Sequence, residues 1–133
     1  MALKLTLKPN EKTIIGGAVI TNGNSKSNLI IENKVPILRE KDILNEEKAD
    51  TPARRIYFVI QLMYIDEQNL VVHHNNYWEL VKAFLKAAPS RLEVIDRISE
   101  HILHRHYYKA LKLCRELISY EEEIKTNVYK KPH

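Results

Sequence analysis

Residues 49–64, ADTPARRIYFVIQLMY, decide the fold because the period of the apolar residues changes there. Before this stretch, apolar and polar residues alternate in short runs such as LKLTLK at residues 3–8, which is the period of half-buried strands. From this stretch onward, apolar residues recur every three or four positions, as an amphipathic helix requires. The sequence therefore predicts an α+β protein in three parts: a β-rich region over residues 1–50, an α-helical bundle over 51–124 and a flexible basic tail over 125–133.

The composition is that of a soluble globular protein. Of the 133 residues, 44% are hydrophobic and 29% are charged, and no apolar run approaches the roughly 20 residues of a membrane span. The N-terminus, Met-Ala-Leu-Lys-Leu-Thr, has neither the apolar segment nor the cleavage site of an export signal. A single cysteine, Cys114, allows no internal disulfide, which fits a reducing cytoplasm. We therefore expect a cytoplasmic protein with no membrane partner.

The β-rich region is predicted to form one small antiparallel sheet of about four short strands, with the leucines of the first strand on one face. Gly16-Gly17 indicates a bulge or a close backbone approach, Asn22-Gly23 indicates a type I′ hairpin, and Asn33-Lys34 indicates another tight turn. About 50 residues in short strands bury little surface, so we expect this region to pack on the helical half or on a second copy in a homodimer. The expected strands are Ala2–Lys8, Thr13–Thr21, Asn28–Glu32 and Val35–Leu38.

The bundle is predicted to contain four antiparallel helices joined by short links. Thr51 as N-cap and Pro52 at the first helical position start the first helix. A polar loop containing His73–Asn76 precedes the second helix, and a capping box of Ser90 and Glu93 starts the third. The expected core positions include Ile56, Val59, Ile60, Met63, Tyr77, Val81, Phe84, Leu92, Ile95, Ile98, Ile102, Leu111, Cys114 and Leu117.

No residue pattern predicts catalysis or a metal site. His101 and His104 share a helix face, and His106 and the His73-His74 pair are nearby candidates, but no HExxH, CxxC or carboxylate at ligand spacing accompanies them. Ser90 is expected to cap a helix, and Cys114 lies on an apolar stripe where a thiol is inert. With 3 glycines in the chain, no glycine-rich phosphate loop can form. We therefore predict no catalytic residue, no metal, no cofactor and no enzymatic activity.

Two adjacent cations, Arg54 and Arg55, lie in the first turn of the first predicted helix, where the helix dipole disfavours positive charge. One explanation is that they pair with Asp50 and the neighbouring acids of the connector. The other is an anion site, in which a phosphate uses both guanidinium groups and the free backbone amides of the helix start.

The β-rich region adds further cations. Residues 1–45 contain 7 Lys and Arg against 4 Asp and Glu, and the whole chain has a net charge of +4 and a pI near 9.1. This balance is compatible with a polyanionic partner, although lysines on an exposed strand also serve solubility and edge protection. The candidate RNA contacts are Lys4, Lys8, Arg39, Lys41, Arg54 and Arg55.

Five motifs follow one another along the chain: MALKLTLKPNEKTIIGGAVITNG at 1–23, PILREKDIL at 36–44, ADTPARRIYFVIQLMY at 49–64, KAAPS at 86–90 and YKALKLCRELISYEEE at 108–123. Together they resemble the FlbT family of flagellum biosynthesis repressors of alphaproteobacteria. The resemblance implies a post-transcriptional regulator that associates with the 5′ untranslated region of flagellin messenger RNA and promotes its degradation, in balance with the partner FlaF. In some lineages the effect is activating. Asn10 stands where the family has glycine, and asparagine also tolerates a left-handed turn.

An alternative within the same setting is a protein interaction module, a chaperone-like binder of flagellin or FlaF that affects the RNA indirectly. Its motivation is the aromatic content of the helical half, because tyrosine and tryptophan are enriched at interfaces. Trp78 and Tyr77 cannot lie on one helix face, so we expect one of them to be exposed. The aromatic residues concerned are Tyr57, Tyr64, Tyr77, Trp78, Tyr107, Tyr108 and Tyr120.

Residues 1–44 carry a second, shorter likeness. The order Leu3–Thr6, Glu11, Ile14–Gly16, Arg39-Glu40 and Ile43 is similar to that of the carbon storage regulator CsrA. This similarity implies an intertwined dimer of short strands that grips RNA with its first strand and the region around its last. Arg39 would then correspond to the arginine of the RNA-gripping element, and Leu7 replaces an expected basic residue.

Overall fold

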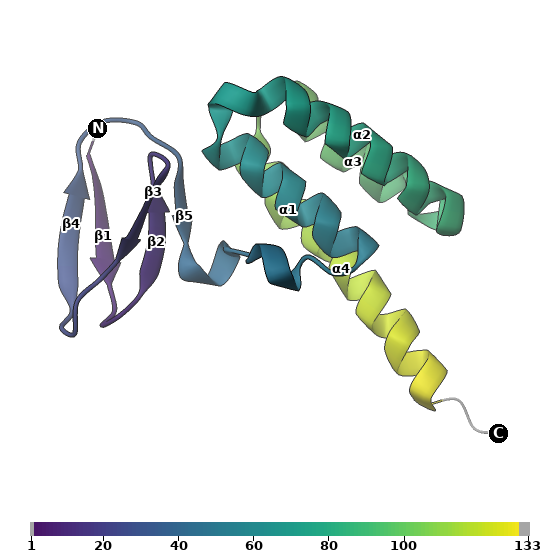
Figure 1. The fold of residues 1–133 in the computed structure, drawn as a ribbon, viewed down its shortest axis with the longest axis horizontal. Helices are drawn as coiled ribbons and strands as arrows, with labels where there is room; N and C mark the ends of the chain where they lie inside the picture. Colours follow the sequence, from purple (N-terminus) through teal and green to yellow (C-terminus); the bar gives the residue numbers. More distant parts are fainter. Residues whose placement is uncertain (1, 131–133) are drawn as a thin grey trace. The chain divides into compact units, whose positions relative to one another are not determined.

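The change of period after Asp50 lies near a structural division of the chain. The computed structural model describes the backbone of residues 2–130 and the side chains of residues 2–126. The chain divides into two compact units, a strand unit that ends at Ile43 and a helical unit that begins at Leu44. Strands occupy the first and α-helices the second, which confirms the predicted α+β fold class (Figure 1).

The strand unit contains five short strands in two sheets, instead of one sheet of about four. β1 (Leu3–Leu7) pairs antiparallel with β4 (Ser27–Ile31). β2 (Lys12–Ile15) pairs antiparallel with β3 (Ala18–Thr21) on one edge and with β5 (Ile37–Arg39) on the other. A short 3₁₀ turn, η1 (Glu40–Asp42), follows β5. The core of the unit draws on both sheets, and its buried apolar side chains among the described residues are Leu5, Leu7, Ile14 and Leu38.

The hairpin turn lies at a different place from the predicted one. Gly16 and Gly17 form the two-residue link between β2 and β3, with φ of 57° and 87°, and two positive φ values are what a type I′ turn requires. The predicted strand Thr13–Thr21 is therefore a hairpin. Asn22-Gly23 instead connects strands of different sheets, so the prediction of a hairpin there was wrong. Asn33-Lys34 likewise joins β4 to β5, which do not pair with each other.

The described residues of the helical unit form a bundle of four α-helices, α1 (Pro52–Ile65), α2 (Leu70–Ala87), α3 (Leu92–Leu103) and α4 (Tyr107–Lys130). Single 3₁₀ turns lie at η2 (Glu46–Lys48), η3 (Glu67–Asn69) and η4 (Pro89–Arg91). α1 packs against α2 and α4, and α3 packs against α4 (Figure 1). The side chains that are fully buried in this unit include Ile56, Ile60, Met63, Tyr77, Ile98, Leu111 and Leu117.

The start of α1 confirms the sequence prediction. Thr51 has extended backbone dihedrals, and its Oγ1 accepts a hydrogen bond from the backbone N–H of Arg54 at 3.2 Å. Pro52 occupies the first helical position, where its missing N–H costs nothing.

Two other predicted boundaries were wrong. His73–Asn76 lie inside α2 and form no loop, because His73 is buried and its Nε2 lies 3.0 Å from Oδ2 of Asp66. Ser90 lies in η4, and the N-cap position of α3 is Arg91, which makes no capping bond through its side chain. Leu92, expected in the core, is 50% exposed, since it opens the helix on its outer side.

The C-terminal part of the chain continues the last helix. α4 extends through Lys130, so the predicted flexible tail, residues 125–133, begins as helix. Its last three residues lie outside the described residues.

Candidate nucleic-acid interface

A tight turn at the end of β1 places the first cation. The backbone N–H of Glu11 donates to the carbonyl of Lys8 at 3.1 Å, with Pro9 and Asn10 between them. Asn10 has a φ of 63°, so it takes the left-handed position of a type II turn, in agreement with the expectation from the sequence. Lys8 and Glu11 are thereby held at the two ends of one rigid turn.

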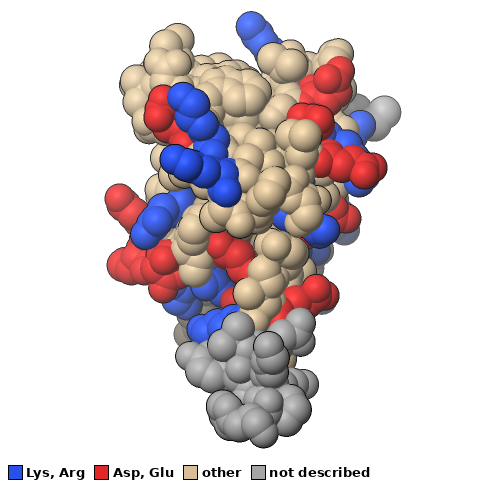
Figure 2. All heavy atoms as spheres, turned by 90° about the vertical axis from the view of Figure 1, so that its right-hand side faces the viewer, with Lys and Arg blue, Asp and Glu red and all other residues tan. Residues whose placement is uncertain are grey.

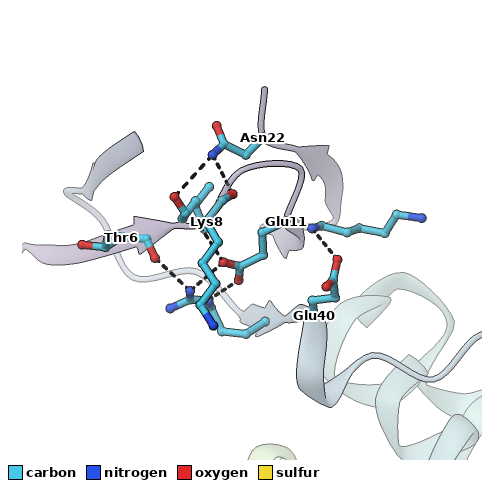
Figure 3. A network of polar contacts seen from close by, with 8 residues as sticks. Thr6, Lys8, Glu11, Asn22 and Glu40 are labelled. Atoms are coloured by element: carbon cyan, nitrogen blue, oxygen red, sulfur yellow. Dashed lines mark hydrogen bonds and ion pairs between the residues drawn. The ribbon is translucent and has the colours of Figure 1, made fainter. Parts of the chain in front are cut away.

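A bidentate ion pair joins this turn to the end of β5. The Nε of Arg39 donates to Oε2 of Glu11 at 2.8 Å, and its Nη2 donates to Oε1 of Glu11 at 3.0 Å (Figure 3). Nη2 also donates to the backbone carbonyl of Thr6 at 2.9 Å. The antiparallel register that places Thr13 opposite Arg39 brings the two partners together across β2 and β5. Because Arg39 of β5 also bonds Thr6 of β1, this pair links the two sheets.

The carboxylate of Glu11 is held in its charged form. Its side chain is only 9% exposed, and besides Arg39 it accepts a hydrogen bond from the backbone N–H of Lys8 at 3.0 Å. The hydrogen bonds from Arg39 and Lys8 lower the pKa of Glu11 from 4.5 to about 2. The same pairing raises the pKa of Arg39. Glu11 therefore offsets much of the guanidinium charge at neutral pH.

Three of the predicted cations line one cleft of the strand unit. The cleft has a volume of about 410 Å³ and is lined by Lys8, Pro9 and Glu11 of the turn and by Arg39, Glu40 and Lys41 after β5. Glu40 also links the cleft to β2, since its Oε1 accepts a hydrogen bond from the backbone N–H of Lys12 at 2.8 Å (Figure 3). Lys8 and Lys41 are exposed to solvent. In contrast, only 33% of the Arg39 side chain is exposed.

Lys4 lies outside this cleft. It is exposed on β1, and it stands opposite Ile30 of β4 on the outward face that also carries Thr6 and Asn28. Thr6 donates a hydrogen bond from Oγ1 to Oδ1 of Asn28 at 2.9 Å on this face. Asn22 braces the adjoining loop, because its side-chain amide donates to the carbonyl of Lys8 at 2.8 Å (Figure 3). The same amide also donates to the carbonyl of Ser25 at 2.9 Å.

The predicted anion site at the start of α1 is filled by the protein's own carboxylate. Glu121 of α4 accepts hydrogen bonds from the hydroxyl of Thr51 at 2.6 Å and from the backbone N–H of Ala53 at 2.9 Å. Arg54 is paired as well, with Asp50 at 3.4 Å and with Glu122 at 2.6 Å. The pairing explanation therefore accounts for Arg54. Arg55, the next residue, is exposed, and the ion pairs found among residues 2–126 do not include it.

The remaining chemical candidates have structural roles. His74 lies 3.2 Å from the hydroxyl of Tyr107, and His104 bonds the carbonyl of Glu100 at 2.8 Å through Nδ1. Within the described part of the chain, no group of three or more His, Cys, Asp and Glu side chains is arranged to hold a metal ion. Cys114 is fully buried, and burial raises the pKa of its thiol. The described helices also include none that is long and apolar enough to cross a membrane.

The face of the molecule in Figure 2 carries no field of one sign, because lysines and arginines are interspersed there with acids. That face therefore shows no single field that would attract a polyanion. Pro9, Glu11 and Glu40 are the cleft residues that the sequence did not assign to a site. The sequence signal for Glu11 was its charge, which is opposite to that of Arg39. Arg39 lies just after the predicted strand Val35–Leu38, and only the register of β2 and β5 shows that the two side chains are neighbours.

Comparison with known proteins places the chain in a family. The family model described as "Flagellar protein FlbT" matches residues 3–125. The chain belongs to the FlbT family. The match covers both the strand unit and nearly all described side chains of the helical unit, so the cleft and the bundle lie within the family's shared region.

Three curated relatives illustrate the similarity. The chain is 45% identical to a probable flagellum biosynthesis repressor protein FlbT 1 of Bradyrhizobium diazoefficiens, over 94% of this chain and 86% of the relative. It is 42% identical to the flagellum biosynthesis repressor protein FlbT of Caulobacter vibrioides, over 92% of this chain and 89% of the relative. It is 43% identical to a probable FlbT repressor of Rhodopseudomonas palustris, over 93% and 98%. No solved structure matches the chain.

Proposed function

We propose that this FlbT-family protein regulates flagellum biosynthesis after transcription, by associating in the cytoplasm with the 5′ untranslated region of flagellin messenger RNA and promoting its degradation. The names of its relatives, flagellum biosynthesis repressors, support the biological setting. The single observation that supports contact with RNA is the cleft in which Lys8, Arg39 and Lys41 converge on a β-scaffold.

The cleft suits a single-stranded segment better than a duplex. A protein reads RNA sequence chiefly in loops and bulges, where unstacked bases and backbone phosphates are both accessible. The cleft has two walls, the turn at residues 8–11 and the end of β5. The Arg39–Glu11 pair and the hydrogen bond from Lys12 to Glu40 hold these walls in place. The backbone positions that carry the cations are thereby fixed before binding, which lowers the conformational cost of association.

The cations of the cleft have different roles in this proposal. Glu11 offsets the charge of Arg39, so Arg39 mainly holds the walls together. Its bonds to Glu11 and Thr6 use Nε and Nη2, which leaves Nη1 as the nitrogen that those three bonds do not engage. Lys8 and Lys41, both exposed at the cleft, are the lysines that meet phosphates in this proposal, and Lys4 extends the contact along β1.

The test is a pair of matched double variants. Lys8→Gln with Lys41→Gln removes two cations from the cleft, whereas Lys26→Gln with Lys34→Gln removes two exposed cations of the same unit that do not line it. The affinity for the 5′ untranslated region of the flagellin transcript from the same genome is measured by filter binding over a range of salt concentrations. Each contact to a single-strand phosphate contributes about 0.7 to the salt slope, so the cleft variant should lower it by about 1.4.

The control variant should keep both the affinity and most of the slope. Equal affinities and slopes for the two double variants would refute the cleft as the RNA site. Loss of binding in both would show only a diffuse charge effect and would refute it as well. Since the sequence predicts no catalytic residue, decay would follow from exposure of the transcript or recruitment of a nuclease.

We also propose that the protein acts as a homodimer joined through its strand units. Among the described strands, β1, β3, β4 and β5 each have one edge without a neighbouring strand, and such edges pair readily with another chain. Three large apolar side chains of this unit, Leu3, Val19 and Ile30, are 49%, 65% and 65% exposed. Sedimentation equilibrium should give a dimer mass for the full chain and a monomer mass for Ile30→Lys. A monomer mass for the unaltered chain would exclude this assembly.

A further inference from the structure

Two hollows meet on the helical unit at Arg55 and Leu80. The first, of about 280 Å³, lies among α1, α2 and α4, and Phe84 and Ile124 are among its lining residues. The second, of about 440 Å³, lies along η2, α1 and α2, and Phe58 and Leu62 contribute to it. Arg55 and Leu80 line both hollows. The two hollows therefore adjoin, and we refer to them together as the trough, a largely apolar surface on which Arg55 is the one cation among the described lining residues.

None of the ion pairs found among residues 2–126 includes Arg55, and the acids around the start of α1 are engaged by other groups. Asp50 and Glu122 bind Arg54, and the carboxylate of Glu121 is held by Thr51 and by the N–H of Ala53. Arg55 also lies in the first turn of α1, where the helix dipole adds to its positive potential. A carboxylate on a ligand in the trough would relieve both effects.

We propose that this trough binds an amphipathic α-helix of a partner protein, which presents a carboxylate to Arg55 between two clusters of apolar side chains. Helices bind apolar grooves in this way through anchors at positions i, i+3 or i+4, and i+7. Glu46 and Glu79 line the second hollow and are exposed, so they favour a basic residue at that end of the helix. The same acids disfavour a nucleic-acid strand, which would bring phosphates next to carboxylates.

The rim charges thus distinguish this surface from the cleft of the strand unit. The described lining of the trough is largely apolar, with one cation, Arg55, and acids in both hollows, Glu121 in the first and Glu46 and Glu79 in the second. The cleft instead has three cations beside its two acids. The inference does not depend on the proposed contact with RNA, because no residue of the trough belongs to the strand unit. Failure of either proposal leaves the other unaffected.

The test is selection of peptides on the full-length protein. The probe is a display library of amphipathic peptides of about 16 residues, roughly 24 Å of helix, with the central polar position randomised. We expect the selected peptides to carry Asp or Glu at that position, between apolar residues at helical spacing. Synthetic copies should bind Arg55→Glu about tenfold more weakly than the unaltered protein, because the ion pair becomes a repulsion.

Three further variants decide the result. A peptide with Lys in place of its acid should regain affinity for Arg55→Glu. Ala83→Gln, at an exposed position that lines the first hollow, should weaken binding by obstructing the trough without disturbing the core. Lys82→Glu, a charge reversal on the same helix outside the trough, should leave the affinity unchanged.

The inference is overturned if no peptide is enriched, or if the selected peptides bind Arg55→Glu and Lys82→Glu equally. Competition by single-stranded RNA for the peptide site would identify the trough as a nucleic-acid surface and would also overturn it. So would a dimer that dissociates in Arg55→Glu, since the occupant would then be a second copy of this chain.

Discussion

Replacing Glu11 by glutamine tests whether the bidentate pair with Arg39 holds the strand unit together. A pKa lowered from 4.5 to about 2 corresponds to about 3 kcal/mol, taking 1.36 kcal/mol for each pH unit. Because 33% of the Arg39 side chain is exposed, solvent screens part of this interaction, and we expect a net loss of about 1 to 2 kcal/mol. A unit of this size is stable by only about 2 to 6 kcal/mol. The substitution should therefore remove a large share of its stability.

The pH dependence gives the effect a distinct sign. Folding lowers the pKa of Glu11, so its contribution to stability is complete above the unfolded value near 4.5 and is lost as the pH falls toward 2. The difference in unfolding free energy between the unaltered protein and Glu11→Gln should be constant from pH 7 to about 5.5. It should shrink between about pH 4.5 and 2, because glutamine does not titrate.

The assay must report on the strand unit alone. The one tryptophan, Trp78, lies in α2, so its fluorescence follows the helical unit. Hydrogen exchange of peptides from residues 3–15, read by mass spectrometry, follows β1 and β2 instead. Glu32→Gln, at an exposed position of the same unit, serves as the control and should change the exchange free energy by less than about 0.5 kcal/mol. Equal exchange in Glu11→Gln and Glu32→Gln at pH 7 would refute the reasoning.

Two substitutions in the helical unit test contacts between distant segments. Glu121→Gln removes the negative charge at the start of α1 and should lower the free energy of unfolding by about 1 kcal/mol. The thermal midpoint followed by Trp78 fluorescence should then fall by a few degrees. An equal midpoint for Glu121→Gln and the exposed control Glu123→Gln would contradict this expectation. Gln61→Leu removes both side-chain bonds to the backbone of Leu44, at 2.8 and 3.0 Å, and should cost about 2 kcal/mol. Unchanged hydrogen exchange at the Leu44 amide in that variant would show that the bonds contribute nothing.

The sequence predicted local structure well where one strong signal was present. The period of three and four identified the helices, and the Thr51-Pro52 pair located the start of α1 to the residue. It predicted turns less well because several residue pairs compete for the same role. Asn22-Gly23 has the composition of a hairpin turn, but the Asn22 side chain donates hydrogen bonds to backbone carbonyls of the neighbouring loop. Gly16-Gly17 forms the hairpin instead. Composition alone does not show which of two competent turns will form.

The helix boundaries show a second limit. The polar run His73–Asn76 resembles a loop, but α2 passes through it because His73 turns inward to Asp66 and His74 reaches Tyr107. In the same way, Ser90 has the sequence context of a capping box, whereas Pro89 starts a 3₁₀ turn that delays the helix until Leu92. In both places a tertiary contact or a single proline outweighs the local preference.

The two neighbouring arginines illustrate why the site could be only partly predicted. Successive residues of a helix point about 100° apart, so Arg54 and Arg55 face different neighbours even though the sequence presents them as one pair. Arg54 faces α4 and meets Glu122, which is 68 positions away along the chain, whereas Arg55 lines the trough beside Leu80 of α2. Glu121 then fills the helix start that a phosphate would have used. A search for anion sites at helix starts must therefore account for acids from every packed element. Here those acids engage Arg54, whereas the ion pairs found among residues 2–126 do not include Arg55.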